Sequence, residues 1–400
     1  MNKINYLMIS PNFPENHFKY ALALKNRGVD VIGIGDAYTH EIKDELFVNL
    51  TDYKQCLSLA NTHQMILIIQ KIKDQYGHID FIESNNEFWL DQDSTLREWF
   101  DVKSGFYNSE ISKYKAKSEM KKYFNLAHVK TSPYHLSDNL ENTLKFALEY
   151  GYPLFLKPNI GVGAKGTKVI ENENDIIHFY TNKPKEDFIF EKFMSGKIIS
   201  FDGITNSRGD IIFSSSFRFE VLNDKIVNEE LEDFYFCYKR IPKKISEAGR
   251  KIIKAFNIKS RCFHLEFFKL NKDSIGIGKK NDVIALEINV RSPGGYSPEI
   301  ITASQGIDYY EVYADMICFD KLKQESKTKS CIAASYTRRE RFEYAHSYDE
   351  LKEMYLEKYV MQGEFDKAIK DCMGDSFIIF KCNSIKEAND INKIVKLKKV

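Results

Sequence analysis

Residues 284–291, with the sequence IALEINVR, constrain the fold most, because apolar and polar side chains alternate along them. Alternation with a period of two is typical of a β-strand with one buried face. The side chains expected to face a core are Ile284, Leu286, Ile288 and Val290. The opposite face would carry Glu287, Asn289 and Arg291. A solvated strand face is the simplest explanation of such a pattern, but the neighbouring sequence favours a functional one.

The preceding segment, FHLEFFKL at residues 263–270, predicts a second strand, and the Gly-, Asn- and Lys-rich stretch after it predicts a loop. If the two strands pair as a hairpin, Glu266 faces Glu287. Adjacent carboxylates repel each other unless a proton or a cation lies between them. Carboxylate and amide oxygens are ligands for Mg²⁺, and a guanidinium can bind phosphate or a developing oxyanion. We therefore expect Glu266, Glu287 and Asn289 to bind Mg²⁺ or Mn²⁺, with Arg291 beside them.

A glycine-rich segment lies earlier in the chain. Residues 153–170, PLFLKPNIGVGAKGTKVI, predict a strand, a loop and a second strand. Backbone N–H groups freed by glycine can surround phosphate oxygens, and lysines would add positive charge. The expected phosphate-binding residues are Lys157, Gly161, Gly163, Lys165 and Gly166. The loop is not a P-loop, because no helix is predicted after it, and an ordinary turn is the alternative.

Residues 188–196, FIFEKFMSG, predict an apolar strand that ends at an exposed edge. The backbone of such an edge can pair with the polar atoms of adenine, while apolar side chains pack on its faces. The residues expected at this adenine hinge are Glu191, Lys192, Phe193 and Met194. A plain core strand would have the same composition.

The order and spacing of these segments resemble the ATP-grasp superfamily over roughly residues 110–320. The resemblance implies that Lys113, in SKYKAKSEM, is a first phosphate-binding lysine and Lys157 a second. It also implies a fold like those of carbamoyl phosphate synthase large subunit and biotin carboxylase. Such a fold is α/β, with an N-terminal Rossmann-like pre-ATP-grasp domain, a two-lobed α+β ATP-grasp domain and a small C-terminal α/β cap.

One position departs from the superfamily pattern. Many ATP-grasp enzymes carry G-x-E after the hinge, and the glutamate binds the ribose hydroxyls. Here the corresponding residues are Gly196, Lys197 and Ile198, and an isoleucine side chain accepts no hydrogen bond. Asp202, in SFDG, is the expected replacement. Without one, nucleotide affinity would fall by about one hydrogen bond, roughly 1 kcal/mol.

Alternating strand and helix patterns before the ATP-grasp region predict a parallel α/β unit. The expected boundaries are 1–108 for this unit, 109–190 for the glycine-loop lobe and 191–322 for the metal-binding lobe of the ATP-grasp domain (109–322), and 323–400 for the cap. The loop ESNNEFW, with Glu83, Asn85, Asn86 and Glu87, follows a predicted strand where α/β sheets tend to place ligands. It is a candidate for binding a second substrate, and a polar loop without a function is the alternative. Another candidate is the cap cluster of Arg338, Arg339 and Arg341, although surface arginines without a ligand are commoner.

Composition limits the other classes of function. Net charge is +1, from 58 basic and 57 acidic residues, so no nucleic acid or anionic membrane is expected as a partner. Seven cysteines without any C-x-x-C pair indicate neither a disulfide framework nor a zinc site. The N-terminal apolar run is too short for a signal peptide, and no stretch suits a membrane span. We therefore expect a cytoplasmic protein.

The resemblance implies an ATP-dependent, ADP-forming ligase that joins a small-molecule carboxylate to an amine through an acyl phosphate. Arg291 would be the catalytic residue, because it could stabilise the oxyanion formed when the amine attacks. The alternatives are an enzyme that phosphorylates bicarbonate, as carbamoyl phosphate synthase does, a kinase-like phosphotransferase, and a nucleotide-binding sensor without catalysis. A homodimer is one possible assembly.

Overall fold

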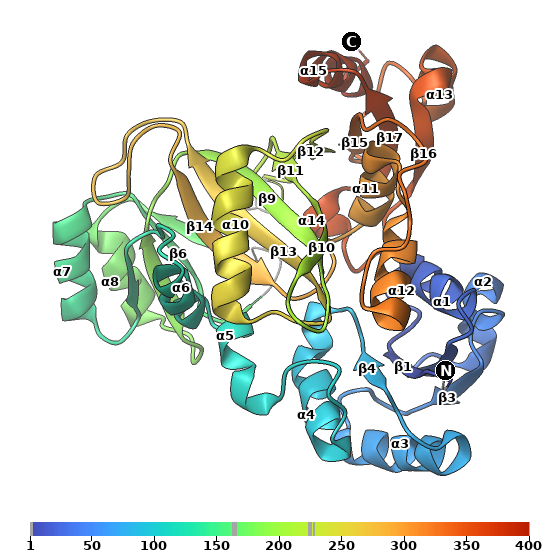
Figure 1. Ribbon diagram of the computed structural model, residues 1–400. Helices are drawn as coiled ribbons and strands as arrows, with labels where there is room; N and C mark the ends of the chain where they lie inside the picture. The colour runs from blue at the N-terminus through green and yellow to red at the C-terminus, as the bar shows by residue number, and fades with distance from the viewer. Residues whose placement is uncertain (1–2, 162–165, 223–225, 227–228, 400) are drawn as a thin grey trace.

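The structure is a computed structural model that describes residues 3–161, 166–222, 226 and 229–399 (Figure 1). Its N-terminal unit contains a sheet with the strand order β3-β2-β1-β4, in which all pairings are parallel. The predicted α/β alternation is therefore confirmed. The elements are β1 (Asn5–Ile9), α1 (Phe18–Lys25), β2 (Asp30–Gly35), α2 (Asp44–Phe47), β3 (Asp52–Gln55), α3 (Thr62–Tyr76), β4 (Phe81–Glu83) and α4 (Leu90–Phe100).

The glycine-loop lobe is an antiparallel sheet with the order β5-β8-β6-β7 and helices packed against it. Its elements are α5 (Ser112–Lys115), α6 (Lys117–Leu126), β5 (Tyr134–Leu136), α7 (Leu140–Tyr150), β6 (Leu154–Pro158), β7 (Lys168–Ile170), α8 (Glu173–Thr181) and β8 (Phe188–Lys192). The predicted pairing of the strands that flank the glycine-rich loop is confirmed, since β6 and β7 are antiparallel. Gly163 and Lys165 of this loop lie outside the described residues.

The central sheet has the strand order β14-β13-β9-β11-β12-β15-β17-β16, with β10 paired to β9. The strands are β9 (Gly196–Thr205), β10 (Ile211–Ser215), β11 (Phe217–Phe219), β12 (Phe234–Cys237), β13 (Arg261–Leu270), β14 (Val283–Asn289), β15 (Ile332–Arg338), β16 (Tyr359–Glu364) and β17 (Ser376–Cys382). Because β15 pairs with β12, the C-terminal strands continue this sheet. The segment expected as a separate cap therefore shares its sheet with the metal-binding lobe.

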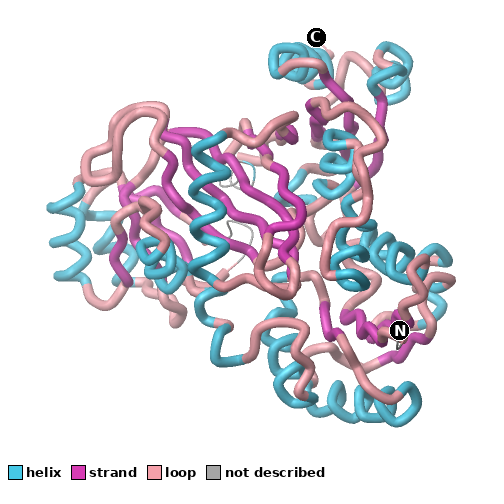
Figure 2. The backbone as a smooth tube through the Cα atoms, in the orientation of Figure 1, coloured by secondary structure: helices cyan, strands magenta, loops and turns pink. Residues whose placement is uncertain are grey.

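The remaining helices are α10 (Lys243–Phe256), α11 (Ser297–Gln305), α12 (Tyr309–Phe319), α13 (Tyr348–Met354), α14 (Lys370–Met373) and α15 (Ile385–Val395). Helix α10 lies across one face of the central sheet (Figures 1 and 2). It buries Ile252 and Phe256 against strand residues such as Leu265 and Ile288. None of the described helices is both long and apolar enough to cross a lipid bilayer.

Strand β14 does not keep the regular alternation expected of it. Ala285 pairs with Phe267 and Glu287 pairs with Glu266, so Leu286 is an extra residue that forms a β-bulge. The predicted core face is therefore wrong in part, because a bulge reverses the side-chain alternation. Ala285, Ile288 and Val290 pack in the core beneath α10, whereas Ile284 and Leu286 pack on the other side of the sheet. The predicted opposition of the two glutamates is confirmed.

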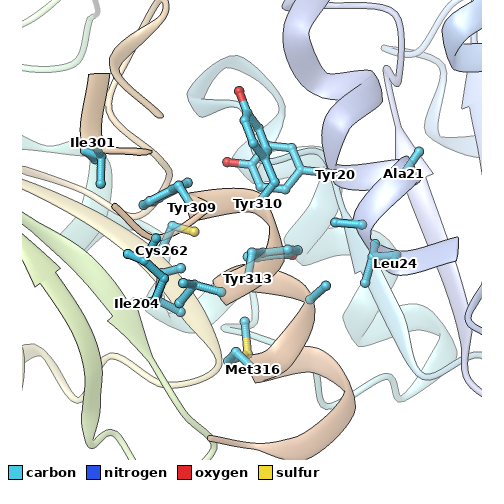
Figure 3. Close-up of a cluster of buried hydrophobic side chains, with 14 of the residues drawn as sticks. Tyr20, Ala21, Leu24, Ile204, Cys262, Ile301, Tyr309, Tyr310, Tyr313 and Met316 are labelled. Carbon is cyan, nitrogen blue, oxygen red and sulfur yellow. The ribbon is translucent and has the colours of Figure 1, made fainter. Parts of the chain in front are cut away.

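The N-terminal unit is fixed to the central sheet by a shared core. Tyr20 of α1 packs against Tyr310 and Tyr313 of α12, and this cluster reaches Ile204 and Cys262 on β9 and β13 (Figure 3). A buried ion pair strengthens the junction, because Glu83 at the end of β4 accepts hydrogen bonds of 2.6 and 3.0 Å from Arg261 on β13. The loop that follows Glu83 is thereby held beside the metal-binding lobe.

Candidate active site

A cavity of about 300 Å³ lies on the face of the central sheet opposite α10. It separates the glycine-loop lobe from the β13–β14 hairpin and also reaches β12 and the loop after β14. Among the predicted site residues, the cavity brings together Lys157, Gly161, Glu191, Lys192, Phe193, Met194, Glu266, Glu287, Asn289 and Arg291. Gly166, Lys113 and Asp202 are not among its lining residues.

Glu191 and Lys157 are parts of one buried ion cluster. The Glu191 carboxylate lies 3.0 Å from Nζ of Lys157 and 2.7 Å from Nζ of Lys121, and all three side chains are almost fully buried. Burial alone would raise the pKa of Glu191, but the two ammonium groups lower it to about 2. Glu191 therefore orients Lys157. The predicted exposed edge is not found here, because β8 pairs with both β5 and β6, and the N–H groups of Lys192 and Phe193 donate to the carbonyl oxygens of Pro133 and Pro153. The sequence analysis did not single out Lys121.

Lys117, and not Lys113, reaches the cavity. Nζ of Lys113 donates to Glu110 at 2.8 Å and lies over the ring of Tyr114, outside the cavity. Nζ of Lys117 donates to the carbonyl oxygen of Gly161 at 2.9 Å, at the start of the glycine-rich loop. The two lysines differ because Ala116 has an extended backbone, which ends α5 and turns the next helix to a new direction.

The two paired glutamates differ in their surroundings. Nε2 of His264 lies 3.2 Å from Glu266, and Nδ1 of the same ring is hydrogen-bonded to Asp202. Burial would raise the pKa of Glu266, yet the hydrogen bond and charge of His264 hold it below its ordinary value. Burial raises the pKa of Glu287, and the charges of Glu266 and Glu87 add to this effect against the charge of Lys117.

Asp202 lies behind His264 and is fully buried. Its carboxylate also accepts a hydrogen bond from the hydroxyl of Ser200. Although burial opposes it, this carboxylate raises the pKa of His264 to about 9. Asp202 therefore orients an imidazolium, and it does not face the cavity where a ribose would lie.

Glu87 connects the N-terminal unit to the end of β14. Its carboxylate accepts hydrogen bonds from Nε and Nη2 of Arg291, at 3.2 and 2.8 Å. The side-chain amide of Asn289 faces the same carboxylate, and with its nitrogen turned towards Glu87 it donates to both oxygens, at 3.2 and 3.1 Å. The sequence analysis placed Glu87 in a ligand-binding loop but did not connect it with Arg291. The two residues are far apart in the sequence, and no local pattern indicates their contact.

The arrangement of Glu266, Glu287 and Asn289 fits a divalent cation. The described residues hold no cluster of three or more His, Cys, Asp and Glu side chains that could bind a metal by itself. Two carboxylates and one amide oxygen leave ligand positions for phosphate oxygens and water, which is usual for Mg²⁺ bound with a nucleotide. Burial is the main cause of the raised pKa of Glu287, and repulsion by Glu266 adds to it; a bound cation would act against both effects.

One end of the cavity has apolar walls, which suit a base. Its walls are Phe155, Met194, Ile198, Phe268 and Leu286. Ile198 is 5% exposed and packs against Met194 and Phe268. No described side chain at this end replaces the missing hydrogen-bond acceptor.

The arginine cluster of the C-terminal segment does not line the cavity. Arg338 donates to the carbonyl oxygens of Val395 and His346, and Arg339 donates to those of Lys370 and Asp371. Arg341 pairs with Glu230. These arginines brace the backbone of the C-terminal segment.

Comparison with known proteins agrees with this geometry. Residues 112–201 match the family described as carbamoyl-phosphate synthase L chain, ATP binding domain. Mitochondrial carbamoyl-phosphate synthase [ammonia] of Mus musculus is 22% identical over 206 residues, which cover 49% of this chain and 13% of that protein. The chain thus matches only a small part of the length of these curated relatives.

Solved structures are similar over nearly the whole chain. L-amino acid ligase from Bacillus licheniformis superposes with a TM-score of 0.72 at 13% identity, covering 99% of this chain and 97% of that one. N5-carboxyaminoimidazole synthetase from Staphylococcus aureus, complexed with ADP, gives 0.71 at 17% identity, with coverages of 97% and 96%. The chain therefore has the ATP-grasp fold. The predicted similarity to carbamoyl phosphate synthase is confirmed for residues 112–201, and the chain shares its fold with a biotin carboxylase domain from Hydrogenobacter thermophilus.

Proposed function

We propose that this protein is an ATP-dependent, ADP-forming ligase that joins a carboxylate to an amine through an acyl phosphate and requires Mg²⁺. One observation carries the proposal: Glu266, Glu287 and Arg291 open into the same cavity as Lys157 and an apolar slot. Transfer of the γ-phosphoryl group of ATP needs all three parts: a metal-binding face, a phosphate-binding lysine and a slot for the base.

The nucleotide would lie across the cavity. Adenine would pack between the apolar side chains around Met194 and pair with the hinge backbone. Lys157, oriented by Glu191, and Lys117, beside Gly161, would bind the phosphates. Gly163 and Lys165 stay predicted contacts, as does Gly166. Glu266, Glu287 and Asn289 would hold Mg²⁺, which would neutralise charge on the transferred phosphoryl group.

Arg291 would bind the substrate carboxylate and then the oxyanion of the tetrahedral intermediate. Its contact with Glu87 supports this role, because the two hydrogen bonds fix the direction of the guanidinium. Nη1 donates a third hydrogen bond, to the carbonyl oxygen of Ser292. Glu87 would act as a positioning residue. The amine attacks the acyl phosphate directly, so no side-chain nucleophile is needed.

A screen of ADP release tests the proposal. ATP and Mg²⁺ would be combined with amino acids singly and in pairs, and with bicarbonate, and products would be identified by mass spectrometry. A C–N-linked product formed with stoichiometric ADP is the expected result. ADP release that depends on bicarbonate would indicate carbamoyl-phosphate-type chemistry, and a stable phosphorylated product would indicate a kinase. ATP binding without ADP formation in any mixture would leave only a nucleotide sensor.

A further inference from the structure

The cavity extends along the sheet to β12, beyond the residues assigned to nucleotide, metal and oxyanion. Asp233 and Tyr235 form the wall there, together with Ser297 and Met373. Asp233 immediately precedes β12, so both side chains point to the same side as Phe219 on the neighbouring strand. This end of the cavity has no part in the proposed phosphoryl transfer.

Asp233 is a buried carboxylate without an ion pair. It is 3% exposed, and its Oδ1 accepts a hydrogen bond of 2.7 Å from the backbone N–H of Phe234. Among the described residues, no lysine, arginine or histidine lies in salt-bridge contact with it. The cations nearby are engaged elsewhere, since Lys396 donates to the carbonyl oxygen of Glu232 and Arg339 donates to other backbone carbonyls. Burial raises the pKa of Asp233 to about 6, although Lys396 partly offsets the effect.

Tyr235 supplies a second buried polar group. The side chain is 1% exposed, and burial raises the pKa of its hydroxyl, although the nearby hydroxyl groups of Ser297 and Ser335 act against this effect. The hydroxyl has no charged partner among the residues that the structure describes. The hydroxyl oxygen lies 4.0 Å from the point that a Cβ atom on Gly295 would occupy. It therefore faces the loop that follows Arg291, where the reacting carboxylate is expected.

A buried carboxylate without a counter-charge is costly beside a buried hydroxyl in one cavity, because burial removes the contacts of both groups with water. A ligand with a positive hydrogen-bond donor would satisfy both. A metal is disfavoured, since only one carboxylate is present, and an anion would be repelled. Phe219 and Met373 make the surrounding wall apolar.

We propose that Asp233 and Tyr235 bind the protonated amino group of a substrate that carries an apolar side chain, such as an apolar amino acid. The inference rests on the proposed ligase function, because it gives that ligase the class of its substrate. In this arrangement the ammonium group lies on Asp233, the apolar side chain packs against Met373, and the carboxylate points towards Arg291.

Pairs of compounds that differ in the amino group test this inference. L-phenylalanine would be compared with hydrocinnamate, and L-leucine with isocaproate, by calorimetric titration in the presence of ADP and Mg²⁺. We expect wild-type protein to bind each amino acid at least about tenfold more tightly than its deamino analogue, since hydrogen bonds to charged groups are the stronger class. Asp233→Asn should abolish this preference.

Two further variants keep the test interpretable. Glu232→Gln is the matched control, because Glu232 adjoins Asp233 but contacts Tyr344 and Lys398 outside the cavity, and it should retain the preference. Tyr235→Phe removes only the hydroxyl and keeps the buried ring, so the protein should still fold while the preference falls about threefold. This variant tests the site even if Asp233→Asn does not fold.

The result that overturns the inference is a wild-type protein that shows no preference for the amino acids, or an Asp233→Asn protein that keeps it. Parallel ADP-release measurements separate this failure from failure of the proposed function. Amino acids that bind with the expected preference but never release ADP would contradict the ligase and support the subsite. ADP release from substrates bound equally well without an amino group would contradict the subsite and support the ligase.

Discussion

Glu191 and Glu287 both line the cavity, and their surroundings shift their pKa values in opposite directions. Glu191 lies between the ammonium groups of Lys121 and Lys157, so its pKa falls to about 2 in spite of burial. Glu287 faces Glu266 across the hairpin, and burial raises its pKa above the ordinary value. One carboxylate has two ammonium groups in contact with it. The other forms no ion pair with any residue that the structure describes, although Lys117 and Lys157 act on it from a distance.

This difference separates a supporting part of the site from a binding part. A fully compensated carboxylate fixes the position of its partners and has little attraction left for a ligand. A carboxylate held beside like charges gains free energy when a cation arrives. In the proposed ligase, the glycine-loop lobe would meet the nucleotide with its charges already paired, whereas the β13–β14 hairpin would need a cation to complete it.

The largest expected effect is on stability and concerns Glu191, the carboxylate that contacts two lysines. Glu191→Gln should lower the free energy of unfolding by about 3–5 kcal/mol, because it leaves two buried lysines without a counter-charge. Denaturant unfolding at neutral pH measures the change. Glu141→Gln is the control, since Glu141 forms an exposed pair with Lys145 and should cost less than about 0.5 kcal/mol.

The pH dependence of the same variant sharpens the comparison. Because the folded-state pKa of Glu191 is depressed from 4.5 to about 2, its contribution is fully present above pH 4.5 and is lost as pH falls towards 2. The stability difference between wild type and Glu191→Gln should shrink over this window. A difference that stays constant down to pH 2 would show that the ion cluster is not its source.

The next effect concerns the end of β14. Arg291→Ala should reduce ADP-forming turnover by about a hundredfold to a thousandfold, the usual effect of removing one oxyanion-stabilising group. Binding of ADP with Mg²⁺ should remain largely intact, because Arg291 does not contact the base-binding slot. Turnover assays and calorimetry measure the two quantities separately. Loss of both together would identify Arg291 as a structural residue.

Glu287→Gln tests the carboxylate that has no ion pair among the described residues. The affinity for ADP in the presence of Mg²⁺ should fall about tenfold to a hundredfold, while affinity without Mg²⁺ should be nearly unchanged. Stability at neutral pH should not fall, since the substitution removes a charge that the folded state disfavours. A stability loss similar to that of Glu191→Gln would break the contrast between the two glutamates.

The sequence predicted the local parts of this arrangement well. Alternation along residues 284–291 and the loop before them were enough to place Glu266 opposite Glu287. The bulge at Leu286 could not be foreseen, because periodicity assumes a regular strand. The choice between Lys113 and Lys117 was equally hidden, since both lie in KYKAK and only the backbone at Ala116 separates their directions.

The unpredicted residues share a physical cause. Glu87 reaches Arg291, and Lys121 reaches Glu191, across contacts between elements that are distant in the sequence. Asp233 and Tyr235 became visible only because the structure places a buried carboxylate without an ion pair beside a buried hydroxyl in the cavity wall. Asp202 was predicted to bind the ribose because it follows the hinge closely in the sequence. Its side chain is instead hydrogen-bonded to His264. Burial and pairing are tertiary properties that composition does not specify.

The smallest expected effect lies at the apolar end of the cavity. Ile198 packs against Met194 and Phe268 and accepts no hydrogen bond, so a nucleotide gains no side-chain contact with its ribose hydroxyls there. Calorimetric titration should therefore give dissociation constants for ADP and 2′-deoxyADP that agree within about fivefold, or roughly 1 kcal/mol. A preference for ADP well beyond this range would mean that a group outside the described residues contacts the ribose. In that case the apolar end of the cavity, like the ion cluster around Glu191, would already contain partners for its ligand. Only the end around Glu287 would still need a ligand to complete it.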